Sequence, residues 1–123
     1  MSEDPALGDL LELLSDEYAR EILAATSVKP MSANQIADRC GMSLPTVYRR
    51  VGRLKEFDLI EEQTRVEPGG NDYSEFTATL SEVSVSLDEG TFEAVVERAS
   101  TEAFPGATEE DTADRFVKMW EGL

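Results

Sequence analysis

Apolar residues recur at helical spacing along the first part of the chain. Leucines stand at positions 7, 10, 11 and 14, the i, i+3, i+4, i+7 pattern of one face of a helix. A second apolar face follows in the segment DEYAREILAAT, where Tyr18, Ile22 and Leu23 share one side. Ser15 or Asp16 stands where the cap of this helix belongs. We therefore expect two helices in the first quarter of the chain.

The next segment carries both start and stop signals. Ser32 and Gln35 form a capping box, in which the side chain of each residue accepts a hydrogen bond from the backbone N–H of the other. Gly41 supplies a left-handed stop. Ser43 then caps another helix, with Pro45 in its first turn, where proline is tolerated. Two helices joined by a short glycine-containing turn form the helix-turn-helix pattern.

Alternating positions replace the helical spacing after this pair of helices. LIEEQTRV is predicted to be a strand, EPGGND a loop, and YSEFTATL a second strand. Helix, turn, helix and hairpin occur in this order in a winged helix. The alternation shifts phase at Ser81-Glu82 and resumes at Val83, which predicts a bulge or a break into a further strand.

Two more helices are predicted to close the chain. The first has an apolar face of Phe92, Val95, Val96, Ala99 and Ala103, and the second begins at Thr108 and carries Ala113, Phe116, Val117 and Trp120. The expected fold is mainly α with a small antiparallel β wing. It divides into a winged helix-turn-helix over residues 1–88 and C-terminal helices over residues 89–123, within one compact unit.

Length and composition limit the class of protein. The 123 residues suffice for one domain with a buried core. No apolar run approaches the roughly 20 residues that span a bilayer, and the N-terminus lacks the features of a secretory signal. We expect a soluble, cytoplasmic protein without membrane contact.

Cysteine and histidine usage argues against several kinds of site. Cys40 is the only cysteine, so an internal disulfide and a multi-thiolate zinc site are excluded. Histidine is absent, which removes Ser-His-Asp and Cys-His nucleophiles and imidazole metal ligands. Acid-base catalysis by carboxylates stays possible, but acids are so abundant that none of them points to a site. We therefore expect no enzyme, no metal and no cofactor.

Positive charge is scarce and concentrated in one part of the chain. Asp and Glu number 26 against 11 Lys and Arg, for a net charge of -15. Residues 29–65 nevertheless hold seven bases and five acids, whereas the segments on either side are strongly acidic. The dispersed acids favour adaptation to high salt over an acidic surface for a basic partner.

The helix after Gly41 gathers this positive charge on one side. On a helical wheel, Val47, Val51 and Leu54 face the core, opposite Arg49 and Arg53. Such a helix fits the major groove, where an arginine bonds guanine in bidentate fashion. A merely solvated arginine face is the alternative. Including side chains placed for phosphates and the one base near the wing tip, the candidate DNA contacts are Ser32, Gln35, Ser43, Pro45, Thr46, Tyr48, Arg49, Arg50, Arg53, Lys55 and Arg65.

The segment MSANQIADRCGMSLPTVYRRVGRLKEFDLIEEQ resembles the winged helix-turn-helix of arsenical-repressor-like (ArsR-type) regulators, especially the small acidic ones of halophilic archaea. The matching motifs are IAxxCGMS, PTVYRR and LKEFDLI, and the resemblance extends over about Leu10 to Leu80. It implies a dimeric transcription factor. Its recognition helix would carry Pro45, Thr46, Tyr48, Arg49 and Arg53 toward operator DNA.

Two features depart from this family. Its metal-sensing members use paired cysteines or histidines, which this chain lacks. The wing tip EPGGND is acidic, where a DNA contact favours Arg or Lys. Cys40 is either a small buried residue beneath the turn or a redox switch, which needs exposure and a lowered pKa.

Two apolar faces are candidates for a dimer seam. They are the leucine face of Leu7, Leu10, Leu11 and Leu14 and the aromatic face of Phe116, Val117 and Trp120. Two-fold symmetry would place two recognition helices about 34 Å apart on a pseudo-palindromic operator in double-stranded DNA.

The leading hypothesis is thus a homodimeric, sequence-specific DNA-binding regulator of transcription adapted to high salt. The alternative is a winged-helix module that binds protein and not specific DNA.

Overall fold

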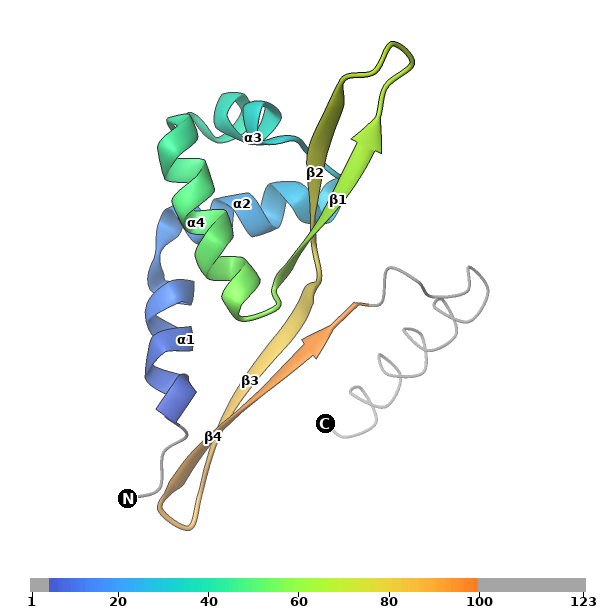
Figure 1. Ribbon diagram of the computed structural model, residues 1–123. Helices are drawn as coiled ribbons and strands as arrows, with labels where there is room; N and C mark the ends of the chain where they lie inside the picture. The colour runs from blue at the N-terminus through green and yellow to red at the C-terminus, as the bar shows by residue number, and fades with distance from the viewer. Residues whose placement is uncertain (1–4, 100–123) are drawn as a thin grey trace.

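Four helices followed by two antiparallel hairpins make up the computed structural model, which describes residues 5–99 (Figure 1). The elements are α1 (Pro5–Ser15), α2 (Glu17–Val28), α3 (Ala33–Cys40), α4 (Leu44–Glu56), β1 (Ile60–Val66), β2 (Asp72–Ala78), β3 (Leu80–Asp88) and β4 (Thr91–Arg98). Helices α3 and α4 form the helix-turn-helix, and β1 and β2 form the wing. The predicted winged helix-turn-helix is confirmed.

The helix ends follow the capping signals of the sequence. The carboxylate of Asp16 accepts from the backbone N–H of Tyr18 at 3.0 Å and caps α2. At the start of α3, the Gln35 N–H donates to Ser32 Oγ at 3.2 Å and the Ser32 N–H donates to Gln35 Oε1 at 2.9 Å. Gly41 ends this helix with φ +65°, the left-handed region that glycine enters without steric cost.

The core lies where α2, α3 and α4 meet. Ile22, Ile36, Val47 and Leu54 are fully buried there, one or two from each helix. The wing is attached to this layer through Phe76 of β2, which is buried beside them and exchanges two backbone hydrogen bonds with Met31, at 3.0 and 2.7 Å. The base of the wing therefore has a fixed place relative to the start of α3.

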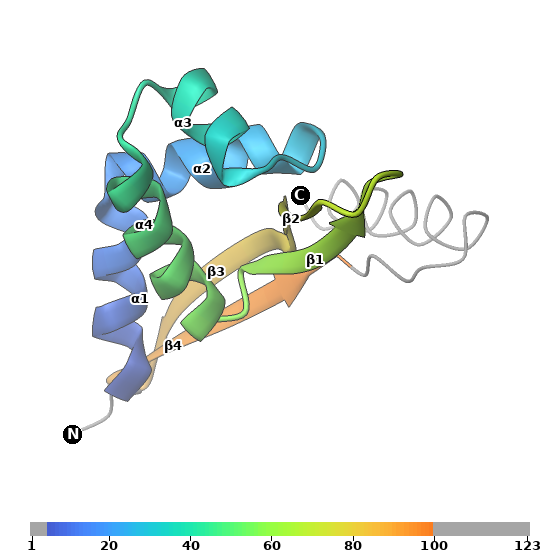
Figure 2. The same cartoon turned by 45° about the horizontal axis from the view of Figure 1, so that its top comes forward.

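The two hairpins extend toward opposite ends of the molecule. The wing pairs Ile60 with Ala78 at its base and Val66 with Asp72 near its tip, and its exposure rises toward the tip. In both views the turn between β3 and β4 lies beside the N-terminal end of α1, away from the tip of the wing (Figures 1 and 2). The wing thus projects on the side of the helix-turn-helix.

The prediction of a helix that begins near Phe92 is wrong, because Thr91–Arg98 forms β4; Ala103 lies outside the described residues. Asp88 pairs with Thr91 across a two-residue turn, in which Glu89 and Gly90 have φ of +50° and +82°. Two consecutive positive φ values favour a tight hairpin. The apolar residues then pair across the strands, as Leu87 does with Phe92.

Two other predictions concern the start of β3 and the residues after β4. The register shifts between Leu80 and Glu82, which confirms the predicted bulge. The helix expected from Thr108 lies outside the described residues.

The leucine face of α1 is turned into the protomer. Leu7 is 2% exposed and Leu10 is 5% exposed, so neither has surface left for a second subunit. This burial does not favour a dimer seam at these two leucines, and the seam itself stays a prediction. Leu11 remains exposed and Leu14 half-buried, whereas Phe116, Val117 and Trp120 lie outside the described residues.

Across residues 5–99, the helices are too short or too polar to cross a bilayer.

Two glycines provide a matched test of the left-handed stop. Replacing Gly41 or Gly52 by alanine brings the new Cβ within 4 Å of no other atom, so packing does not distinguish them. Gly41→Ala forces alanine into φ +65° and is expected to lower the unfolding free energy by about 1 kcal/mol. Gly52→Ala, inside α4, is expected to raise it by about 0.5–1 kcal/mol.

Denaturant unfolding followed by circular dichroism measures both changes. Effects of the same sign in the two variants would contradict this account of the turn.

Candidate nucleic-acid interface

Helix α4 is anchored along one side. Its side chains Val47, Val51 and Leu54 are at most 3% exposed, as the helical wheel predicted. Ser43 caps the helix by accepting from the Thr46 backbone N–H, and Pro45 occupies the first turn. Both signals start the helix at the turn after α3. The opposite side of α4 is consequently turned to solvent.

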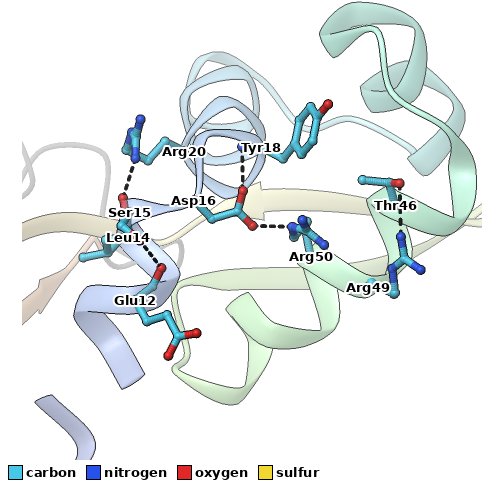
Figure 3. Close-up of polar contacts among 9 residues, drawn as sticks. All are labelled: Glu12, Leu14, Ser15, Asp16, Tyr18, Arg20, Thr46, Arg49 and Arg50. Atoms are coloured by element: carbon cyan, nitrogen blue, oxygen red, sulfur yellow. Dashed lines mark hydrogen bonds and ion pairs between the residues drawn. The ribbon is translucent and has the colours of Figure 1, made fainter. Parts of the chain in front are cut away.

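The exposed side of α4 presents side chains that suit a groove of DNA. Pro45, Tyr48, Arg49 and Arg53 are exposed, and Tyr48 reaches 58%. Thr46 is half-buried and joins residues of the first turn, because its Oγ1 accepts from Ser43 Oγ at 2.9 Å. The same oxygen accepts from Arg49 Nη2 at 3.4 Å (Figure 3). The Arg49 side chain is thus drawn toward the N-terminal end of α4.

Arg50 is held against the start of α2. Its Nε donates to Asp16 Oδ2 in an ion pair, and its guanidinium carbon lies 5.7 Å from the centroid of the Tyr18 ring (Figure 3). Both partners come from the junction of α1 and α2. The sequence placed Arg50 at the edge of the helix as a phosphate contact, and the structure gives it this additional link within the protein.

Carboxylates of the protein itself accompany most bases of the proposed interface. Three further ion pairs lie within residues 5–99, namely Arg53 with Glu56 at 2.6 Å, Lys55 with Glu62 at 2.6 Å, and Arg65 with Glu75 at 2.8 Å. Arg49 has no acidic partner in that part of the chain. A phosphate approaching α4 would therefore meet one unpaired arginine and several that already contact a carboxylate.

Glu62 connects α4 to both strands of the wing. Its Oε1 accepts from Lys55 of α4 at 2.6 Å, and its Oε2 accepts from Ser74 of β2 at 2.6 Å. The bond from Lys55, and after it that from Ser74, holds the pKa of the Glu62 carboxyl below its ordinary value. The carboxylate is therefore ionised at neutral pH and joins α4, β1 and β2.

The start of α3 is occupied by its own capping bonds. Ser32 Oγ and Gln35 Oε1 each accept from the other residue's backbone N–H. The Ser32 hydroxyl proton and the Gln35 amide N–H groups make no further hydrogen bond within residues 5–99, so both side chains keep donors for a phosphate. That they contact DNA stays a prediction.

The tip of the wing is acidic in space as well as in sequence. Glu67 and Asp72 flank the turn and are exposed, and the turn itself closes through the Gly70 N–H donating to the Glu67 carbonyl at 3.0 Å. Arg65 lies farther down β1 and bonds Glu75 across the strands. The wing therefore offers phosphate repulsion at its tip and a paired arginine below it.

Cys40 lies in surroundings that disfavour thiolate chemistry. It is half-buried, and its Sγ lies 3.8 Å from the Glu21 carbonyl oxygen, to which the thiol donates. Burial raises the pKa of the Cys40 thiol, the charge of Glu21 raises it further, and Arg39 opposes both. Since a reactive thiol needs a lowered pKa, the packing interpretation is favoured over a redox switch.

Metal-ligating clusters of three or more acidic, cysteine or histidine side chains do not occur in the described part of the chain.

The partners of the arginines are what sequence reasoning missed. Arg53 and Glu56 stand at i, i+3 on one helix, a spacing that predicts such a pair. Arg65 and Glu75 meet only once the wing register is known, and Asp16 and Arg50 lie 34 residues apart. Asp16 was identified as a helix cap, but no local pattern connects it to Arg50.

A comparison with protein-family models agrees with this geometry. A model described as a helix-turn-helix domain matches residues 14–63, the range from the end of α1 into β1. It includes α3, the turn, α4 and the bases of the proposed interface up to Lys55. A search of curated proteins gave no match to the chain.

Proposed function

We propose that this protein is a transcriptional regulator that binds specific double-stranded DNA, with α4 in the major groove. The observation that carries the proposal is the division of α4 into two sides. Val47, Val51 and Leu54 are buried, while Arg49 and Arg53 stand exposed on the other side. The match of a helix-turn-helix domain to this range supports it.

The contacts divide into base reading and positioning. Arg49 and Arg53 are suited to bidentate hydrogen bonds with guanine, and Thr46 to a contact with a thymine methyl group or a base edge. Tyr48, Lys55 and the start of α3 are placed for phosphates, which fix the register of the protein on the duplex. Bases read by the first two turns of α4 would determine the operator.

The proposed active form is a homodimer. One recognition helix reads only a short half-site, and two helices related by a two-fold axis read the two half-sites of a pseudo-palindrome. Because Leu7 and Leu10 are buried within the protomer, Leu11 is the leucine of α1 with most surface for a seam. Phe116, Val117 and Trp120 are the other proposed seam residues.

The family resemblance and the net charge suggest the class of regulator and the conditions in which it works. The motifs around the turn support an ArsR-type regulator, with a signal other than a metal bound by paired cysteines or histidines. The net charge of -15 supports a protein that works at high salt. We propose no enzymatic activity and no cofactor.

A protein-binding winged helix is the second candidate function. The acidic wing tip favours it, because Glu67 and Asp72 repel phosphate. Under this alternative, the wing would contact a basic protein and α4 would bind no specific DNA sequence.

The two arginines on the exposed side of α4 provide the first test. Arg49→Ala and Arg53→Ala are each expected to cost about 1–3 kcal/mol of specific binding, and together to abolish it. A mobility-shift assay at high KCl, on a genomic fragment selected by the wild-type protein, measures the loss. Circular dichroism is expected to show an unchanged fold, since neither side chain is buried.

Arg20→Gln is the matched control for this test. It also removes one positive charge, but Arg20 points away from α4 and bonds the Leu14 carbonyl (Figure 3). Its DNA affinity is expected to stay near that of the wild type. Unchanged binding in the Arg49 and Arg53 variants would remove that side of α4 from the interface.

The ion pairs of the interface predict an unusual dependence of binding on salt. DNA-binding proteins ordinarily lose affinity steeply as salt rises, because counterions are released from the DNA. Here DNA that binds Arg53 or Arg65 displaces Glu56 or Glu75, and the carboxylate left unpaired beside the DNA attracts a cation. Uptake offsets release, so affinity is expected to change weakly, or to rise, with KCl.

Titrations of one operator fragment from low to molar KCl measure this dependence. In Glu56→Gln and Glu75→Gln proteins, which cannot take up those cations, affinity is expected to fall more steeply with salt. A steep loss in the wild-type protein would refute the prediction.

A further inference from the structure

A hollow of about 370 Å³ separates the junction of α1 and α2 from the recognition helix. Arg50 and Arg53, one turn apart on α4, line it from one side. Glu12 and Asp16 line it from the other, together with Leu13 and Ser15. Two bases and two acids therefore share one hollow at the border of the exposed side of α4.

The two acids differ in what they contact. Asp16 uses both carboxylate oxygens, since Oδ1 accepts from the Tyr18 N–H at 3.0 Å and Oδ2 accepts from Arg50 Nε. Figure 3 shows its carboxylate turned toward Arg50. The Glu12 carboxylate has no hydrogen-bond or ion-pair partner in the described part of the chain.

Arg50 is consequently fixed on one edge and open on the other. Its Nε bonds Asp16, and the ring of Tyr18 supports the guanidinium plane at 5.7 Å. Its two Nη groups make no hydrogen bond to residues 5–99, and the side chain remains 29% exposed. A guanidinium held in this way keeps the donors that suit a phosphate, with less rotamer entropy to lose on binding.

We propose that this hollow receives a phosphate of the DNA backbone, that the Nη groups of Arg50 bind it, and that Asp16 is the positioning residue for Arg50. The proposal rests on the proposed DNA-binding function. It gives the two acids opposite roles. Asp16 strengthens binding because it orients the arginine, and Glu12 weakens binding because its unpaired charge repels the phosphate.

Two single substitutions separate these roles. Asp16→Asn keeps a good helix cap but loses the charge that holds Arg50, and is expected to weaken DNA binding by about tenfold. Glu12→Gln is expected to tighten binding by about two- to threefold. Simple removal of negative charge would tighten binding in both, so equal or tighter binding by the Asp16→Asn protein overturns the proposal.

A chemical change in the DNA distinguishes positioning from a structural role. Each phosphate of a selected fragment is replaced in turn by a neutral methylphosphonate, and the affinity of each duplex is measured. At one position in each half-site, the methylphosphonate is expected to lower the affinity of the wild-type protein about tenfold. It is expected to lower the affinity of the Arg50→Lys and Asp16→Asn proteins much less. If Asp16 had only a structural role, the variants would lose as much affinity at that methylphosphonate as the wild-type protein does. That result would overturn the proposal.

Melting temperatures of all variants accompany these titrations. If the Asp16→Asn protein fails to fold, the comparison of the wild-type and Arg50→Lys proteins still tests the phosphate contact. Lysine keeps the positive charge but lacks the paired N–H donors of the guanidinium group. Wild-type protein that binds no DNA would overturn the proposed function and this inference together. Wild-type binding with no phosphate position that depends on Arg50 would overturn the inference alone.

Discussion

The burial of one side of α4 is the constraint on which the rest of the molecule depends. Val47, Val51 and Leu54 pack on the core formed with α2 and α3, and Leu59 and Ile60 continue the same core into the wing. This contact sets the rotation of α4 about its axis. Rotation in turn decides which residues face solvent, so the polar side of the helix is a consequence of its apolar side.

Electrostatics then acts on a surface whose shape is already determined. Arg50, Arg53, Lys55 and Arg65 each pair with a carboxylate of the protein, and these carboxylates have two different effects. Glu62 and Asp16 hold bases in place between elements, whereas Glu56 and Glu75 pair with exposed side chains that a ligand can compete for. Such exposed pairs contribute little stability, about 0–1 kcal/mol, so a phosphate can replace them at small cost.

Local signals explain where sequence reasoning succeeded and where it did not. Helix α3 begins after Ser32 and ends before Gly41, as the capping box and the glycine stop predicted, because both signals act within a few residues of the ends they define. The segment of Phe92, Val95 and Val96 fits both helical and strand spacing, and pairing with β3 decides between them. The link of Asp16 to Arg50 depends on how α2 and α4 pack, which no pattern within either helix reveals.

Selection of DNA by the wild-type protein tests the central claim that the exposed side of α4 reads a sequence. Purified protein is incubated at molar KCl with fragmented genomic DNA from its source, and the recovered fragments are sequenced. The account predicts enriched fragments that share two inverted half-sites whose centres lie about one helical turn apart. Recovery of fragments without any common sequence, together with a protein partner that co-purifies, would contradict it.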